Sequence, residues 1–153
     1  MNRTLAVISI ISISAFAGNM INIGLSYGIH WLSLDAMEFM TTFKIDFPLL
    51  LGPTVLTLLP AFIGTLLMYF YTKKDVTLKR YWSISLVCLL IVNLQTVVYH
   101  LPVNLGFMDH KYSAIEAASK LKTWIFLHWI RVIVTIVAAV YAINGFEKMK
   151  NKN

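Results

Sequence analysis

Charge and cysteine are both scarce in this chain. Charged residues make up 13% of the 153 residues and hydrophobic residues 58%. Soluble domains are about 25% charged and about 45–50% apolar, so too few polar side chains are present to cover a globular surface in water. The composition excludes an ordinary cytosolic globule, a disordered chain and, despite a formal net charge of +6, a nucleic-acid binder. It predicts an integral membrane protein.

Several familiar chemical signatures are also missing. The single cysteine, Cys88, excludes an internal disulfide, a CxxC redox pair and a zinc finger. Because Cys88 lies within an apolar run, we expect it to be a buried, inert thiol. The sequence contains no Gly-rich phosphate loop, no HExxH metal motif and no Ser-His-Asp order. Any function must therefore be inferred from polar residues inside the apolar runs.

Four apolar runs are long enough to cross a bilayer core about 30 Å thick, which needs roughly 20 residues per helix. The runs are continuous rather than alternating, which indicates helices rather than strands. We predict an all-α integral membrane four-helix bundle forming a single membrane domain, residues 1–153, with helices at about 5–30, 49–71, 82–102 and 124–145. The amphipathic stretches 31–47 and 113–122 are predicted to be short extracytoplasmic segments.

The distribution of lysine and arginine predicts the orientation of the helices. Eight cations lie on one side, in the chain ends and the second loop, and four lie on the other side. The positive-inside rule then places both termini in the cytoplasm of a multi-pass membrane protein, in the inner or plasma membrane if the cell is bacterial. Ala15 to Gly18 imitates a signal-peptide cleavage site, but the apolar run continues well beyond it, so we expect no cleavage.

Polar side chains fall in one sector of each predicted helix when residues are placed about 100° apart. Such side chains are costly in lipid, so we expect these sectors to meet inside the bundle as a polar pocket near the outer membrane face. For threonines such as Thr54 we favour a role in helix packing. The residues that we predict to contact a substrate are Asn22, Ser26, Asn93 and Trp124.

Arg131 is the strongest functional signal in the sequence, because it is a charged residue within an apolar run. A charge at that depth costs at least ~2.5 kcal/mol unless a partner or a water-filled cavity offsets it. The alternative is that Arg131 extends to the membrane surface or bonds backbone carbonyls. His100 and His128 lie near its depth on two helices. They suit proton transfer, metal or haem ligation, or satisfied interfacial positions, and these alternatives stay open.

A metal site is a further hypothesis. His30, His100 and His128 share one membrane level, and imidazole suits copper, iron or zinc. Haem between His100 and His128 is also compatible with the sequence. None of the residues requires a cofactor, so the cofactor remains unknown at this stage.

The segments around the third and fourth predicted helices resemble the anthrone oxygenase-like family of small four-helix membrane proteins. The resemblance rests on the stretch His100-Leu101-Pro102-Val103-Asn104, on Trp124, and on the sequence HWIR that contains His128 and Arg131. It covers the C-terminal third well and extends loosely, through length and helix count, over the whole chain.

This resemblance implies an oxidoreductase that oxygenates hydrophobic, readily enolised aromatic or quinone-like molecules. In that interpretation His100 or His128 removes a proton, and Arg131 and Asn104 stabilise the resulting oxyanion. The competing interpretation is a non-enzymatic membrane protein that binds a lipid, a quinone or a metal, or a subunit of a larger complex. The expected partners are the lipid bilayer and a hydrophobic small molecule, and the sequence leaves homo-oligomerisation open.

Overall fold

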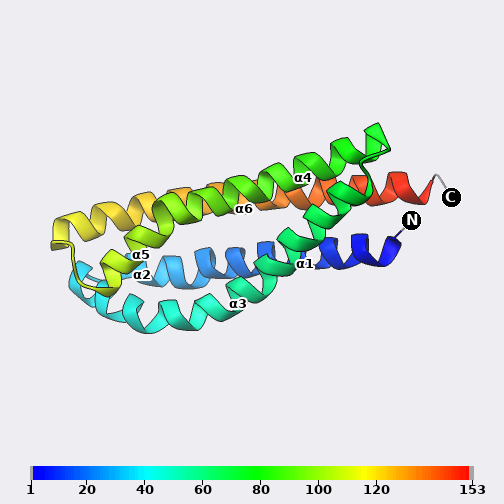
Figure 1. Cartoon of the computed structure of the whole chain (residues 1–153). Coiled ribbons are helices and arrows are strands. Elements are labelled where there is room, and N and C mark those ends of the chain that lie inside the picture. Colours follow the sequence, from blue (N-terminus) through cyan, green and yellow to red (C-terminus); the bar gives the residue numbers. More distant parts are fainter. Residues whose placement is uncertain (1, 152–153) are drawn as a thin grey trace.

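The computed structural model describes residues 2–151 and contains four long helical rods (Figure 1). The first and third rods each include a π-helical turn, labelled η. The elements are α1 (Arg3–Asn22), η1 (Ile23–Gly28), α2 (Ile29–Ser33), α3 (Ala36–Tyr71), α4 (Val76–Gln95), η2 (Thr96–His100), α5 (Leu101–Met108) and α6 (Ala114–Lys150). This architecture confirms the predicted all-α four-helix bundle.

Each rod is long and apolar enough to span a membrane, which confirms a multi-pass membrane protein. The rods contain 31 to 37 residues, or about 45–55 Å at about 1.5 Å per residue, so they extend beyond the hydrocarbon core. They are therefore longer than the sequence predicted.

The predicted amphipathic segments 31–47 and 113–122 are not separate elements, because α3 and α6 continue through most of them. The side chain of Asp35 caps α3 by accepting hydrogen bonds from two backbone N–H groups. Ser113 and Glu116 form a capping box at the start of α6. The second predicted helix, 49–71, begins earlier in the structure, and α3 runs through Pro48, because an internal proline kinks a helix without having to end it.

The rods alternate in direction, so both chain termini lie at the same end of the bundle, and the α2–α3 and α5–α6 connections lie at the other end (Figure 1). α1 packs against α3 and α6, and α4 packs against α6 and α3. A single ring of four rods therefore surrounds the core.

The half of the bundle that carries the termini, here called the terminal half, has a core rich in small and aliphatic side chains. Its cluster includes Ala6, Ala61, Leu89, Ala138 and Ala142, all fully buried. At Gly64 an added Cβ would collide with the side chain of Ser9, so glycine is needed for the close approach of α1 and α3.

The opposite end is closed by large aromatic side chains, here called the aromatic cluster. Its members are Trp31, Phe39, Phe43, Phe107 and Trp124, all buried. Ring centroids lie 4.8 Å apart for Trp31 and Phe43 and for Phe39 and Phe107. These aromatic contacts join α2, α3, α5 and α6 at the end of the bundle opposite the chain termini.

Candidate functional site

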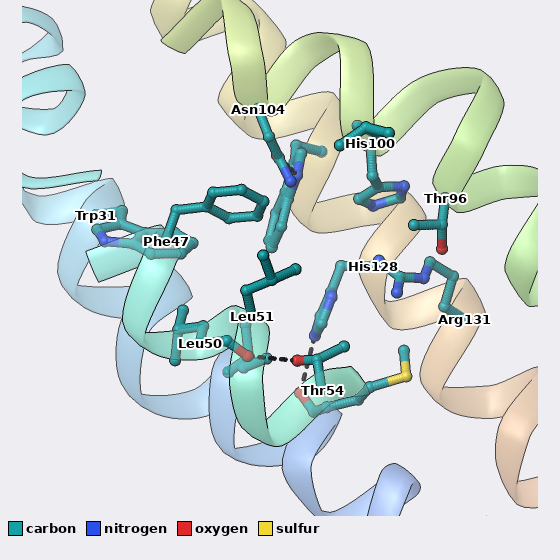
Figure 2. Close-up of a pocket in the computed structure, with 14 residues that line it drawn as sticks. Trp31, Phe47, Leu50, Leu51, Thr54, Thr96, His100, Asn104, His128 and Arg131 are labelled. Atoms are coloured by element: carbon teal, nitrogen blue, oxygen red, sulfur yellow. Dashed lines mark hydrogen bonds between the residues drawn. The ribbon is translucent and has the colours of Figure 1, made fainter. Parts of the chain in front are cut away.

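A cavity of about 100 Å³ lies in the half of the bundle beside the aromatic cluster, here called the cavity half (Figure 2). All four rods contribute to its wall, and the volume has room for several water molecules. The lining residues are Met20, Ile23, Trp31, Phe47, Leu50, Leu51, Thr54, Thr96, His100, Leu101, Asn104, Trp124, His128 and Arg131.

Both π-helical turns border this cavity. η2 supplies Thr96 and His100, and η1 begins at Ile23, which also lines the wall. A π turn holds an extra residue and therefore changes the face to which the following side chains point. Gly24 in η1 allows a close approach to α6, since an added Cβ would lie 2.9 Å from the Trp129 ring and 3.3 Å from the His128 ring. The π turns and Gly24 thus set the geometry around the two histidines.

Arg131 is a buried cation in the wall of the cavity. Only 6% of the residue is exposed, and its Nε atom has no hydrogen-bond partner. Within the described part of the chain no carboxylate offsets its charge. An unpaired charge inside a membrane bundle is costly, so Arg131 is well suited to bind an anionic group in the cavity.

His128 has a fixed orientation one helical turn before Arg131 in α6. Its Nε2 lies 2.8 Å from the carbonyl oxygen of Met20. A carbonyl only accepts, so Nε2 carries the hydrogen, and Nδ1, which has no protein partner, keeps its lone pair. The imidazole also stacks on the Trp124 ring, with centroids 5.0 Å apart and planes 6° apart. His128 therefore has one buried ring nitrogen without a protein partner.

His100 also contacts the Trp124 ring, with ring centroids 5.2 Å apart and planes 65° apart. Its Nδ1 lies 3.4 Å from the carbonyl oxygen of Gln95, which is a weaker contact than that of His128. Its Nε2 is buried and has no protein partner. Two histidines therefore each leave one nitrogen unpaired in the same region.

Asn104 holds the Trp124 ring, which contacts both histidines. The Trp124 Nε1–H donates a 2.7 Å hydrogen bond to Asn104 Oδ1. This bond fixes the Trp124 ring and leaves the Asn104 amide nitrogen available as a donor. The structure therefore brings His100, Asn104, Trp124, His128 and Arg131 together around one cavity.

Asn22, Ser26 and Asn93 do not line the cavity. Asn22 and Ser26 are exposed, and the Ser26 hydroxyl donates to Asn22 Oδ1 over 3.1 Å, so the two side chains satisfy each other. Asn93 Nδ2 donates to the Leu89 carbonyl oxygen of its own helix. The inward face of the first rod consists of apolar and small residues such as Met20 and Gly24, which leaves Asn22 and Ser26 on the outside.

The three histidines of the predicted metal site are not brought together. His30 is exposed and borders a separate surface hollow with Ser26, Tyr27 and Asp46. Among residues 2–151, no group of three His, Cys, Asp or Glu side chains is close enough to hold a metal ion. The predicted set of His30, His100 and His128 is therefore corrected to the pair His100 and His128, which could still act as ligands together with groups from outside the chain.

Sequence reasoning missed the contribution of α3. Phe47, Leu50 and Leu51 line the cavity, but apolar residues in an apolar run carry no chemical signal. Thr54 lines it as well and accepts a 3.0 Å hydrogen bond from Asn19 Nδ2. Thr54 belongs to the polar sector that the sequence predicts for its helix, but the sequence favours a packing role for it and not a place in the cavity wall.

Comparison with known proteins identifies a protein family that this chain matches. The family model described as anthrone oxygenase matches residues 39–141, which include all of α4, η2 and α5 and most of α3 and α6. No curated protein and no solved structure matched the chain. The matched range contains His100, Asn104, Trp124, His128 and Arg131.

Proposed function

The chain belongs to the anthrone oxygenase family, and from that membership we propose that it is a membrane-embedded oxidoreductase that oxygenates a hydrophobic, enolisable aromatic compound. The observation that carries the proposal is the buried Arg131, without a carboxylate partner, beside the unpaired nitrogens of His100 and His128. One cavity thus offers both a base and a cation to a substrate that becomes negatively charged.

The first step is removal of a proton from an activated carbon. In an anthrone-type ring system a CH₂ group lies opposite a ketone, and loss of a proton gives an aromatic oxyanion. His128 is the better base of the two histidines, because its 2.8 Å bond to the Met20 carbonyl fixes the hydrogen on Nε2 and leaves Nδ1 free. Arg131 then stabilises the oxyanion, and the Asn104 amide donates a second hydrogen bond.

The second step consumes molecular oxygen. The carbanion passes one electron to O₂, the two radicals combine, and a proton yields a hydroperoxide at the former CH₂ carbon. Loss of water from this hydroperoxide leaves a second ketone, so CH₂ plus O₂ becomes C=O plus H₂O. This chemistry needs no bound cofactor, because the electron comes from the substrate anion.

We also propose an orientation, on the basis of the charge distribution. With both termini in the cytoplasm, as the lysine and arginine distribution favours, the cavity half lies toward the outer side of the membrane. In a bacterial cell this is the periplasmic side of the inner membrane.

Oxygen uptake tests the proposal. The protein is reconstituted in phosphatidylcholine vesicles with anthrone, and uptake is compared with that of protein-free vesicles containing the same amount of anthrone. We expect His128→Ala to lower the protein-dependent rate about 10²–10⁴-fold, the range for loss of a general base. His100→Ala should have a smaller effect, because the contact that orients its ring is weaker.

The matched control is His110→Asn. His110 is exposed in the α5–α6 connection, and its φ of 51° is one that asparagine tolerates. This variant should retain the wild-type rate. Wild-type activity in His128→Ala would contradict the assigned base. A stoichiometric metal or haem that is lost in a His100→Ala/His128→Ala variant would contradict the cofactor-free scheme.

A further inference from the structure

The exposed residues of the cavity wall all lie on one side of it. Leu51 of α3 is 48% exposed and Leu101 of α5 is 41% exposed. Phe47, Thr54 and Thr96, on α3 and η2, are partly exposed, and the other lining residues are buried. The exposed lining side chains therefore lie on α3 and on the η2–α5 segment, which are neighbours in the bundle.

In contrast to this side, the end of the bundle that carries the α2–α3 and α5–α6 connections is closed. The aromatic cluster lies between the cavity and the α2–α3 and α5–α6 connections, and its five side chains are at most 4% exposed. Trp31 also contacts the Trp124 ring at 5.6 Å, and its Nε1–H donates a 2.9 Å hydrogen bond to Asp46 Oδ2. These contacts leave the lateral face of the bundle as the accessible side.

The α3 helix is also the rod that is least enclosed. In its most apolar stretch 22% of residues are buried, compared with 39% for the first rod and for α6. Pro48 and Pro53 lie on either side of Leu51, and each removes one backbone hydrogen bond from the helix. Figure 1 shows that α3 is curved along its length, as proline-containing helices commonly are.

We infer that the substrate enters sideways from the hydrocarbon core of the bilayer, through an opening between α3 and the η2–α5 segment that is flanked by Leu51 and Leu101. The inference rests on the proposed function for the identity of the substrate, and it specifies a substrate class: an uncharged, planar aromatic molecule that dissolves in lipid. Such a molecule passes Leu51 and Leu101 in its neutral form and becomes an anion only beside Arg131. Water-soluble, permanently charged analogues would not reach the site.

Cysteine labelling tests the route without requiring turnover. A Thr96→Cys variant in a Cys88→Ser background carries a single thiol in the cavity wall, and the Thr96 hydroxyl bonds only its own helix, at Val92 O. In phosphatidylcholine vesicles the thiol should react with N-ethylmaleimide, which enters lipid, at least tenfold faster than with a sulfonated stilbene maleimide, which stays in water. Complete labelling of the denatured protein verifies that the thiol is present.

Substitutions at the opening then change the rate in opposite directions. Leu51→Trp/Leu101→Trp should slow labelling by N-ethylmaleimide at least fivefold, and Leu51→Ala/Leu101→Ala should accelerate it at least twofold. The matched controls are Leu56→Trp in α3 and Leu105→Trp in α5, which are exposed but do not line the cavity. These controls should label at the rate of the Thr96→Cys parent.

Three results would overturn the inference: equal labelling by the charged reagent, no labelling of the folded protein by either reagent, or unchanged rates in both the Trp and the Ala variants. Failure of the proposed function has a different signature. In that case the labelling pattern would hold, while anthrone-dependent oxygen uptake would be absent from the wild-type protein.

Discussion

In the terminal half of the bundle the core consists largely of alanine, leucine and methionine, whereas the cavity half combines large aromatic rings with histidine and arginine. Both halves contain buried polar atoms without partners. Those of the terminal half, Trp82 Nε1 and Ser85 Oγ, are neutral and do not line the cavity. Those of the cavity half belong to two bases and a cation. The difference supports the proposal that the cavity half serves binding at a cost in stability, while the terminal half contributes mainly to stability.

The two halves also differ in the backbone geometry of their helices. The terminal half is α-helical in all four rods, while the two π turns occur beside the cavity. A layer formed by Phe16, Met20, Val92 and Val132 separates the two regions. We therefore expect substitutions in one half to affect mainly stability and those in the other half mainly binding and turnover.

The largest expected effect is on stability and comes from the terminal half. Leu89 is fully buried in its core, so Leu89→Ala should lower the free energy of unfolding by about 2–5 kcal/mol. The matched control is Leu90→Ala at the neighbouring position, which is 47% exposed and should change stability little. Thermal unfolding in detergent measures both. An equal loss in the two variants would contradict the assignment of the core.

Arg131→Met, in the cavity half, should lower activity while it raises stability. Removal of the cation should lower the rate about 10²–10³-fold, as expected for loss of an oxyanion-stabilising group. It should also raise the melting temperature, because an unpaired buried charge is replaced by an apolar side chain. Arg80→Met, which removes an exposed cation, is the control for charge alone. A melting temperature that falls with the activity would indicate a structural role for Arg131.

A smaller effect is expected from Gly24→Ala. The added methyl group would press on the Trp129 and His128 rings, which should displace the base and lower the rate about tenfold. Gly18→Ala, in the same rod, meets no atom within 4 Å and should leave the rate unchanged. If both variants behave alike, the position of His128 does not depend on this contact.

The sequence predicted the four helices and the convergence of the third and fourth predicted helices well, for a physical reason. His100, Asn104, Trp124, His128 and Arg131 are polar or amphipathic residues at matching depths, so their cost in lipid directs them inward. The same reasoning failed for Asn22 and Ser26. These two side chains hydrogen-bond each other on the outer surface of the rod, and regular 100° spacing does not apply across the π turn that follows Asn22.

The wall formed by α3 was beyond sequence reasoning, because Leu50 and Leu51 look alike in a sequence. One is buried and the other is 48% exposed, and only the packing of α3 against its neighbours distinguishes them. Likewise, no pattern predicts that the Met20 carbonyl accepts the hydrogen of His128. Such contacts depend on how two distant segments dock.

The most direct test of the central claim is an absorbance titration of 1-naphthol bound to the protein in vesicles. Naphthol is a neutral aromatic alcohol that becomes an anion when it loses a proton, so its ionisation reports the effect of Arg131. We predict that bound naphthol ionises at a pH about one unit or more below that in protein-free vesicles, and that Arg131→Met abolishes this shift. Ionisation at the same pH with and without Arg131 would contradict the claim that the cavity is built to stabilise an aromatic anion.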